Sequence, residues 1–503
     1  MQEQEIESLK GHLAEVKALS EAVAVLGWDQ QTYMPPGGAA GRAAQMTALI
    51  RVIHEKATSQ DLARLLDAAE RAGGSDPDGD DAALLRVARR DFDKTTRIPT
   101  DLAGEMARVT TLAHEEWAAA RAASDWARFA PWLEQILGLT RQVADHLGHG
   151  GERYDALLDQ YEPGMTTAQV RAMFDALQSG TVSLVRRITE RGPAAVDDSV
   201  LHRDFDEAKQ EEFGKGVVRA LGFDWGQGRQ DRAIHPFCTS FGSGDVRITT
   251  RFDRRFLPTA LFGSIHEAGH ALYEQGFAAR YAGSPLAEAA SLGVHESQSR
   301  LWENLVGRSR PFWSHFFPAL QAAFPETLSD TDADSFYQAA NKAEPSLIRV
   351  EADEITYNLH ILLRFEMEQA LLSGALAVSD APAAWNARTQ ELFGLTPPDD
   401  AHGILQDVHW AGGMIGYFPT YTVGNLLSVQ LYEKADADGG GQLAAQIGAG
   451  EFGPLLAWLR DNVHQWGRKY LPGELIGRAV GGPLDPAPYL RYLEAKFGGL
   501  YGV

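Results

Sequence analysis

The five residues from His266 to His270 have the types and spacing of a metal site. They read H-E-A-G-H, and on a helix two histidines four residues apart point from the same face. Two neutral imidazoles placed in this way can hold one Zn²⁺ ion, and Glu267 beside the metal can take a proton from its bound water. The motif therefore predicts metal-assisted hydrolysis. A pattern this short also arises by chance, and a chance copy would lie on a solvated helix face.

The residues around the motif argue against a chance copy. Pro258 suits the start of a helix and Gly276 its end. Unpaired imidazoles on a buried helix would be costly, so burial favours a metal site. Gly269 in the helix interior costs about 1 kcal/mol relative to alanine and indicates close packing against a second element. The apolar side chains that recur at helical spacing are Leu261, Phe262, Ile265, Ala268, Leu272 and Tyr273.

A catalytic zinc site needs one more protein ligand. The candidates that follow the motif are Glu274, Glu288, His295, Glu296 and Glu303. Glu274 could reach the metal only from the same helix. Glu296 follows a turn at Gly283-Ser284-Pro285 and is expected on a second helix packed against the first. Spacing alone leaves Glu296, His295 and Glu288 open as the third ligand.

Two later segments carry candidates for substrate binding. A helix predicted over 346–373 places Arg349, Asp353, Thr356 and His360 on one face. This stripe is either a helix-stabilising pair or the lining of a wet cleft, where Arg349 would suit a planar carboxylate. The Gly- and aromatic-rich segment 409–421 holds His409 and Tyr421. It is either a hydrophobic connection or a loop whose phenol stabilises an oxyanion.

Strand patterns are concentrated directly before the motif. Two runs, 235–241 and 245–252, are separated by Gly242-Ser243-Gly244, and Val246 and Ile248 alternate with Arg247 and Thr249. This pattern predicts a β-hairpin, which is either structural or an edge on which an extended peptide lies. Elsewhere helical periodicity prevails, over nearly all of 1–220 and over about 286–307, 311–324, 332–343, 346–373, 381–393, 423–435, 441–449, 451–466 and 486–496. We therefore expect a mainly α protein with one small hairpin.

Composition narrows the class of protein. The chain has 503 residues and a formal net charge of −22, which argues against nucleic acid or an anionic membrane as a partner. Cys238 is the single cysteine, so neither an internal disulfide nor a thiolate zinc cluster is expected. The N-terminal segment lacks the pattern of a signal peptide, and no apolar run has the length of a membrane span. We expect a cytoplasmic protein.

Together these blocks resemble the carboxypeptidase Taq family of metallocarboxypeptidases. The similarity extends over essentially the whole chain, because an N-terminal block fits as well as the later ones. The matching blocks are Trp28-Asp29-Gln30-Gln31-Thr32-Tyr33-Met34-Pro35-Pro36, His235-Pro236-Phe237, Asp245-Val246-Arg247-Ile248-Thr249, the H-E-A-G-H motif, His295-Glu296-Ser297-Gln298-Ser299-Arg300, Ile348-Arg349-Val350-Glu351-Ala352-Asp353 and Gly416-Tyr417-Phe418-Pro419-Thr420-Tyr421.

The resemblance implies a single catalytic domain over 1–503 with a deep active-site groove, in which 1–220 is the helical N-terminal part and 221–503 binds the metal and substrate. It implies one metal ion per chain, Zn²⁺ or Co²⁺, with His266, His270 and Glu296 as ligands and Glu267 as general base. It also implies a homodimer that removes single C-terminal residues from peptides with broad preference. Arg349 is assigned to the substrate's terminal carboxylate, and the further candidates for substrate binding are Arg247, His235, His409 and Tyr421.

Two other functions remain to be compared with this one. A metallo-oligopeptidase that cuts internal bonds in a deep channel would share the metal chemistry but would need no carboxylate anchor. A helical binding protein with a structural zinc would need four protein ligands and no open position for water, and the sequence offers no second cluster for that arrangement.

Overall fold

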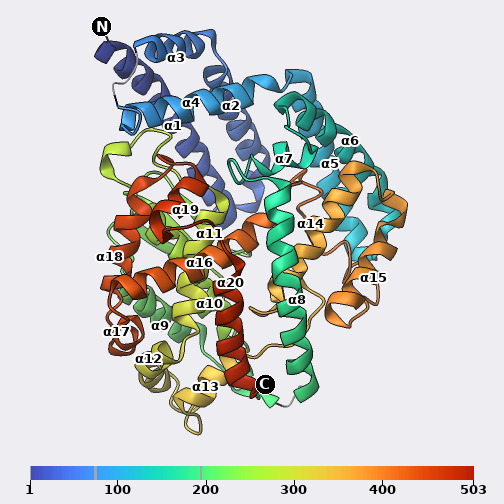
Figure 1. Ribbon diagram of the computed structural model, residues 1–503, viewed down its shortest axis with the longest axis vertical. Helices are drawn as coiled ribbons and strands as arrows, with labels where there is room; N and C mark the ends of the chain where they lie inside the picture. The colour runs from blue at the N-terminus through green and yellow to red at the C-terminus, as the bar shows by residue number, and fades with distance from the viewer. Residues whose placement is uncertain (1, 73–75, 193–194) are drawn as a thin grey trace. The chain divides into compact units, whose positions relative to one another are not determined.

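The computed structural model describes residues 2–72, 76–192 and 195–503. Within these residues the regular structure is helical apart from one three-stranded sheet, so the predicted mainly α fold is confirmed (Figure 1). The chain divides into two compact units: the first comprises Met1–Thr96, Asp198–Ala340 and Leu431–Pro483, and the second comprises Arg97–Asp197, Asn341–Gln430 and Leu484–Val503. A single catalytic domain over the whole chain stays a prediction. No described helix combines the length and the apolar character needed to cross a membrane.

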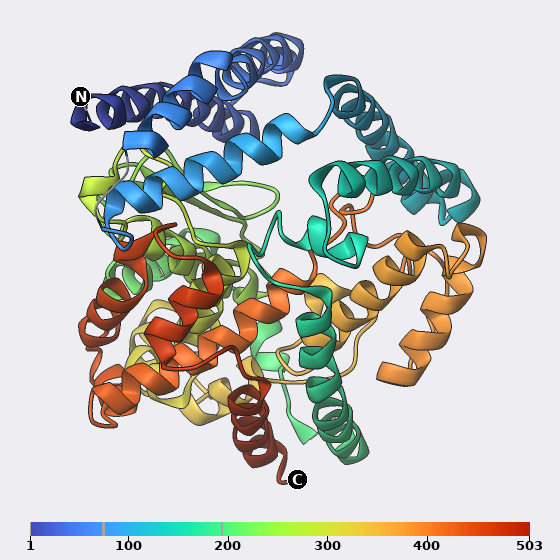
Figure 2. The same cartoon turned by 45° about the horizontal axis from the view of Figure 1, so that its top comes forward.

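The first unit contains the motif helix and the sheet. Its N-terminal helix α1 packs against α2 and α3 (Figures 1 and 2). The helices are α1 (Gln2–Thr32), α2 (Ala39–Ala57), α3 (Gln60–Ala72), α4 (Asp80–Arg97), α9 (Glu207–Ala220), α10 (Leu257–Glu274), α11 (Leu292–Arg300), α12 (Arg310–Ala323), α13 (Ala333–Ala340), α17 (Leu443–Ala449), α18 (Gly453–Asn462) and α19 (Pro472–Val480). Short turns of 3-10 helix are η1 (Pro36–Gly38), η3 (Ser199–His202), η4 (Ala279–Tyr281) and η8 (His464–Trp466), and η5 (Leu301–Gly307) is a π-helical segment.

The regular secondary structure among the described residues of the second unit is helical. Asp125 caps α6 by accepting a hydrogen bond from the backbone N–H of Arg128, and Thr166 and Gln169 form a capping box at α8, as their residue types predict. The elements are α5 (Thr100–Ala123), α6 (Trp126–Leu147), α7 (Arg153–Leu158), α8 (Thr167–Arg191), η6 (Arg349–Glu351), α14 (Tyr357–Ser373), η7 (Val378–Asp380), α15 (Ala381–Phe393), α16 (Pro419–Asp438, counted with the first unit from Leu431), α20 (Pro486–Leu493), η9 (Glu494–Gly498) and α21 (Gly499–Tyr501).

The predicted hairpin forms, and a further strand joins it. Strand β2 (Cys238–Ser240) pairs antiparallel with β3 (Val246–Thr250), and Gly242 adopts a φ of 100° in the connection. Strand β1 (Gly228–Arg232) pairs parallel with β3, so β3 is central in the order β1-β3-β2. Sequence patterns did not predict β1, because G-R-Q-D-R has neither apolar alternation nor a β-branched residue.

Two predicted helices begin later than expected, and the first of them, predicted over 286–307, starts at Leu292. The helix expected over 346–373 starts at Tyr357, and Arg349 lies in the separate 3-10 turn η6. The carboxylate of Asp353 accepts hydrogen bonds from the backbone N–H groups of Ile355 and Thr356, so it forms a local turn in place of a helical face. The prediction that Arg349, Asp353 and His360 share one helical face is therefore wrong.

Candidate metal centre

Helix α10 positions both histidines of the motif. It begins at Leu257 with Pro258 in its first turn and ends at Glu274, close to the predicted limits. Apolar side chains of α10 are buried against α9, α11 and the sheet, as their periodicity predicts. His266 and His270 lie on one face with their ring centroids 4.9 Å apart. Glu267 between them is buried, with 7% of its surface exposed.

Helix α11 brings Glu296 to this face. A Cβ on Gly269 would lie 2.6 Å from the Cα of Ser299 and 2.7 Å from the carbonyl oxygen of Gln298, so the two helix backbones touch at this point. Ser291 caps α11, because its hydroxyl accepts a hydrogen bond from the N–H of Val294. The predicted close packing at Gly269 is confirmed.

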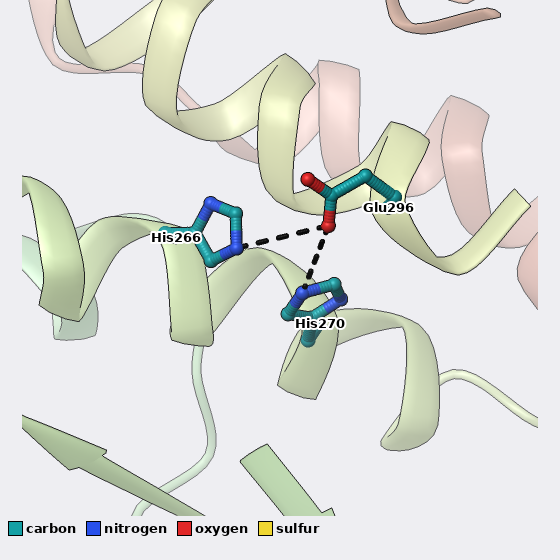
Figure 3. Close-up of side chains that lie close together, drawn as sticks. All are labelled: His266, His270 and Glu296. Atoms are coloured by element: carbon teal, nitrogen blue, oxygen red, sulfur yellow. Dashed lines mark ion pairs between the residues drawn. The ribbon is translucent and has the colours of Figure 1, made fainter. Parts of the chain in front are cut away.

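Three possible donor groups converge between these helices. Oε2 of Glu296 lies 3.5 Å from Nε2 of His270 and 3.8 Å from Nε2 of His266 (Figure 3). The three donor atoms lie within 4.8 Å of one another. Among the described residues, no other group of three or more His, Cys, Asp or Glu side chains has its potential ligand atoms this close together. Tetrahedral zinc with bonds of about 2.0–2.1 Å needs donors about 3.4 Å apart. Two imidazoles and one carboxylate at these separations fit a zinc ion.

Hydrogen bonds behind the donors fix their orientation. Nδ1 of His266 lies 2.9 Å from Oε2 of Glu303, and Nδ1 of His270 lies 3.1 Å from the carbonyl oxygen of His295. Each Nδ1 can donate to its oxygen, and in the neutral form of each ring Nε2 then has a lone pair directed toward Glu296. The other oxygen of Glu296 accepts a hydrogen bond from Nε of Arg300 at 2.7 Å.

The rival ligands from the sequence have other contacts. Glu274 lies 2.9 Å from Nε2 of His295, and Glu288 pairs with Lys17 at 2.9 Å. Glu303 lies behind His266, at its Nδ1. Of the residues that spacing left open, the structure brings Glu296 alone to the Nε2 atoms of both histidines.

Burial and nearby charges shift the pKa values of these groups in different directions. Burial, together with the nearby His295 and His266, lowers the pKa of His270 to about 3, so this ring is neutral at pH 7. Burial alone would raise the pKa of Glu296, but Arg300 and the two histidines outweigh it and hold this pKa well below its usual range. Both groups therefore have the protonation state that ligation requires.

The same surroundings raise the pKa values of His266 and Glu267. Burial would lower the pKa of His266, but the carboxylates of Glu296 and Glu303 outweigh it and raise this pKa. A proton and a metal ion would therefore compete for its Nε2. Burial raises the pKa of Glu267 to about 7, and the Glu296 charge adds to this effect. A carboxyl group that titrates near pH 7 is suited to take up and release protons.

Three of the predicted substrate-binding residues gather in the second unit. The Arg349 guanidinium carbon lies 5.2 Å from the ring centre of Tyr421, and Nε2 of His409 lies 3.4 Å from the Tyr421 hydroxyl. Nη1 of Arg349 donates to the hydroxyl of Tyr357 at 2.9 Å. Arg349 is 6% exposed.

Asp407 and Arg364 complete this cluster, and sequence analysis missed both. Asp407 accepts hydrogen bonds from Arg349 at 2.7 Å and from Nε of Arg364 at 2.6 Å. Burial would raise the pKa of Asp407, but the two guanidiniums outweigh it and keep this carboxylate ionised. The sequence did contain one sign of this cluster, since Arg364 interrupts an apolar run formed by Ile361-Leu362-Leu363 and Phe365. An arginine in such a run is expected to be buried, and a buried arginine requires a partner.

The two remaining candidates lie in the first unit. Arg247 on β3 pairs with Asp245 at 2.7 Å, and its guanidinium carbon lies 4.2 Å from the ring centre of Trp28. His235 is exposed in the connection between β1 and β2. The substrate-binding roles of these two residues stay predictions.

Comparisons with known proteins point to one family. The family model of carboxypeptidase Taq (M32) metallopeptidases matches residues 8–497. The chain is 43% identical to thermostable carboxypeptidase 1 of Thermus thermophilus and 38% identical to carboxypeptidase 1 of Bacillus subtilis, with 97% of each chain covered in both cases. A crystal structure of an M32 carboxypeptidase from Deinococcus radiodurans R1 is similar with a TM-score of 0.97 and 44% identity, covering 99% of this chain and all of that one.

Proposed function

The chain belongs to the carboxypeptidase Taq (M32) family of metallopeptidases, and we propose that it removes single residues from the free C-termini of peptides at a zinc site formed by His266, His270 and Glu296. It is a metallocarboxypeptidase. The observation that carries the proposed site is the convergence of three donor atoms within 4.8 Å beside the buried carboxyl group of Glu267.

The donor set suits a divalent cation of intermediate softness. Two imidazoles and one carboxylate are the ligands of many catalytic zinc sites, and the same set accepts Co²⁺. When bound at these donors, such a cation would polarise the scissile carbonyl and make a water molecule more acidic. One ion per chain follows, because the described residues contain one cluster of this kind.

Glu267 is the proposed general base and acid. In the metal-free site burial raises its pKa to about 7, and the positive charge of a bound cation would lower this pKa and favour the ionised form that accepts the proton of the attacking water. The same carboxyl group then returns the proton to the leaving amine. In the metal-free site His270 is neutral and Glu296 is ionised, which are the protonation states that binding of a cation requires.

Arg349 is the proposed anchor for the substrate's terminal carboxylate. Two guanidiniums, those of Arg349 and Arg364, share the single carboxylate of Asp407, so this cluster carries a net positive charge. Arginine binds carboxylates with two parallel hydrogen bonds. His409 and Tyr421 lie against Arg349 and Asp407 and are proposed to contact the substrate as well. His235 and Arg247 remain further candidates in the first unit.

We also propose that the enzyme is a cytoplasmic homodimer with broad preference for the residue removed. The resemblance to the family supports the dimer, and an acidic composition with a single cysteine supports the compartment.

A product analysis tests the proposed reaction. The zinc-loaded protein is incubated with a peptide that has free ends, and the products are followed by mass spectrometry over time. A ladder shortened one residue at a time from the C-terminal end is expected, and an amidated copy of the same peptide should be stable. Internal cleavage of both peptides at equal rates would contradict the exopeptidase and favour an oligopeptidase.

A further inference from the structure

Glu303 contacts the motif without offering an atom to the donor cluster. Its Oε2 lies 2.9 Å from Nδ1 of His266, whereas Nε2 of the same ring faces Glu296 at 3.8 Å (Figure 3). In the neutral ring, the nitrogen that is hydrogen-bonded to a carboxylate carries the proton, so the opposite nitrogen has the lone pair. Glu303 therefore determines both the tautomer of His266 and the direction of its Nε2.

The backbone that carries Glu303 is a π-helical segment. η5 (Leu301–Gly307) continues directly from α11, and such segments are rare and frequent at functional sites. A Cβ on Gly307 would lie 3.1 Å from Cδ1 of Ile265, so this segment runs close to α10. Close packing of η5 on α10 brings the Glu303 side chain to the His266 ring.

Two arginines hold the Glu303 carboxylate in place. Nη2 of Arg308 donates to Oε1 at 3.1 Å, and Nη1 of Arg300 lies 3.5 Å from Oε2. Arg308 also donates to the carbonyl oxygen of Ala340 at 2.7 Å, and its guanidinium lies 3.8 Å from the ring centre of Phe262. Burial would raise the pKa of Glu303, but the hydrogen bond to His266 and the two guanidiniums outweigh it and keep the carboxylate ionised.

We propose that Glu303 is a positioning residue that holds His266 for metal binding from behind the ring, and that it strengthens metal affinity without being a ligand. This inference rests on the metal site proposed above. A negative charge hydrogen-bonded to Nδ1 makes the imidazole a better donor, and loss of such a partner typically weakens metal binding about 10- to 100-fold.

The test measures zinc affinity by competition with a chromophoric chelator. The variants are Glu303→Gln, which keeps a hydrogen-bond acceptor but loses the charge, and Glu303→Ala, which loses both. Glu288→Gln is the matched control, because Glu288 also pairs with a cation in the first unit but contacts no proposed ligand. We expect affinity about 10-fold weaker for Glu303→Gln, about 100-fold weaker for Glu303→Ala, and unchanged for the control.

A second readout separates positioning from a general structural role. Thermal unfolding of the metal-free proteins should show that Glu303→Gln is folded, with a lower midpoint because Arg300 and Arg308 lose a charged partner. The visible absorption spectrum of the Co²⁺-loaded protein should shift in Glu303→Gln and stay unchanged in Glu288→Gln, because the spectrum reports the donor strength of His266. If Glu303→Ala does not fold, Glu303→Gln decides the outcome.

The outcomes also separate this inference from the proposed function. If the wild-type protein binds zinc and Glu303→Gln binds it with equal affinity and an unchanged cobalt spectrum, the positioning role is refuted while the metal site stands. If the wild-type protein binds no zinc, the proposed metal site itself is refuted.

Discussion

The backbones of α10 and α11 touch at Gly269 and Ser299, where an added Cβ would lie 2.6 Å from the Cα of Ser299. This contact sets the distance between the helix that carries both histidines and the helix that carries Glu296. A backbone atom cannot turn aside as a flexible side chain can, so a larger residue at position 269 must move a helix.

Gly269→Ala should therefore destabilise the protein by about 1–3 kcal/mol and weaken zinc binding, although alanine is the better helix former. Gly138→Ala in α6 is the matched control, because nothing lies within 4 Å of its added Cβ. The control should be neutral or more stable by up to about 1 kcal/mol. Thermal midpoints and zinc affinities check both variants, and a stabilised Gly269→Ala variant with full zinc affinity would show that the close contact is unimportant.

Glu267→Gln should bind zinc as tightly as the wild type and lose about 10²- to 10⁴-fold in kcat, the usual contribution of general acid–base catalysis. Glutamine has the same shape but cannot carry the proton. The measurements are metal content and steady-state kinetics with a free-ended peptide. Retention of wild-type kcat would remove Glu267 from the proposed mechanism, and loss of metal would make it a structural residue.

Arg349→Lys should lower kcat/KM by about 10²-fold, mainly through a higher KM, because lysine cannot form two parallel hydrogen bonds with a carboxylate. Arg388→Lys is the control, since Arg388 in the same unit also holds a carboxylate, that of Glu366, with two hydrogen bonds. The control should keep wild-type kinetics. Equal effects of the two substitutions would indicate general destabilisation and no role for Arg349 in anchoring the substrate.

Local sequence patterns were sufficient to predict the motif helix and the placement of its two histidines on one face. The apolar period, Pro258 and Gly276 determine α10 within a short window, and Gly269 signalled the close contact. Strand β1 was missed, because its polar residues join the sheet only through pairing with β3. The turn that places Arg349 depends on hydrogen bonds of Asp353, which the periodicity does not reveal.

Contacts between distant segments explain what the sequence left open. The third ligand was ambiguous, because choosing among the candidates requires the packing of α11 on α10. Asp407 was missed because its two arginines lie 58 and 43 positions away along the chain. Spacing could identify Glu303 as a candidate ligand but could not place it behind the His266 ring.

The buried carboxyl group of Glu368 predicts a dependence of stability on pH. It accepts hydrogen bonds from Tyr154 at 2.7 Å, from Trp410 at 3.0 Å and from the N–H of Gly416 at 3.1 Å. Burial outweighs these donors and raises its pKa from 4.5 to about 7. The folded state therefore holds this proton more tightly than the unfolded state does. The contribution of Glu368 to the free energy of unfolding is fully present below pH 4.5 and is lost as the pH rises to about 7.

Glu368→Gln removes this titration. The stability of the variant relative to the wild type should therefore increase between pH 5 and pH 8, by on the order of 2–3 kcal/mol. Denaturant unfolding at the two pH values measures the difference in unfolding free energy between the variant and the wild type. A loss of stability from the altered hydrogen bonds is the same at both pH values and therefore cancels in this comparison. Parallel stability curves for Glu368→Gln and the wild type would contradict the shifted pKa.

Anomalous diffraction at the zinc absorption edge, from crystals of the zinc-loaded protein, tests the central claim most directly. We expect one strong peak per chain between α10 and α11, bonded to Nε2 of His266, Nε2 of His270 and an oxygen of Glu296 at about 2.0–2.2 Å, with Glu303 remaining on Nδ1 of His266. A peak elsewhere, or a zinc ion at this position with Glu296 turned away from it, would contradict the account.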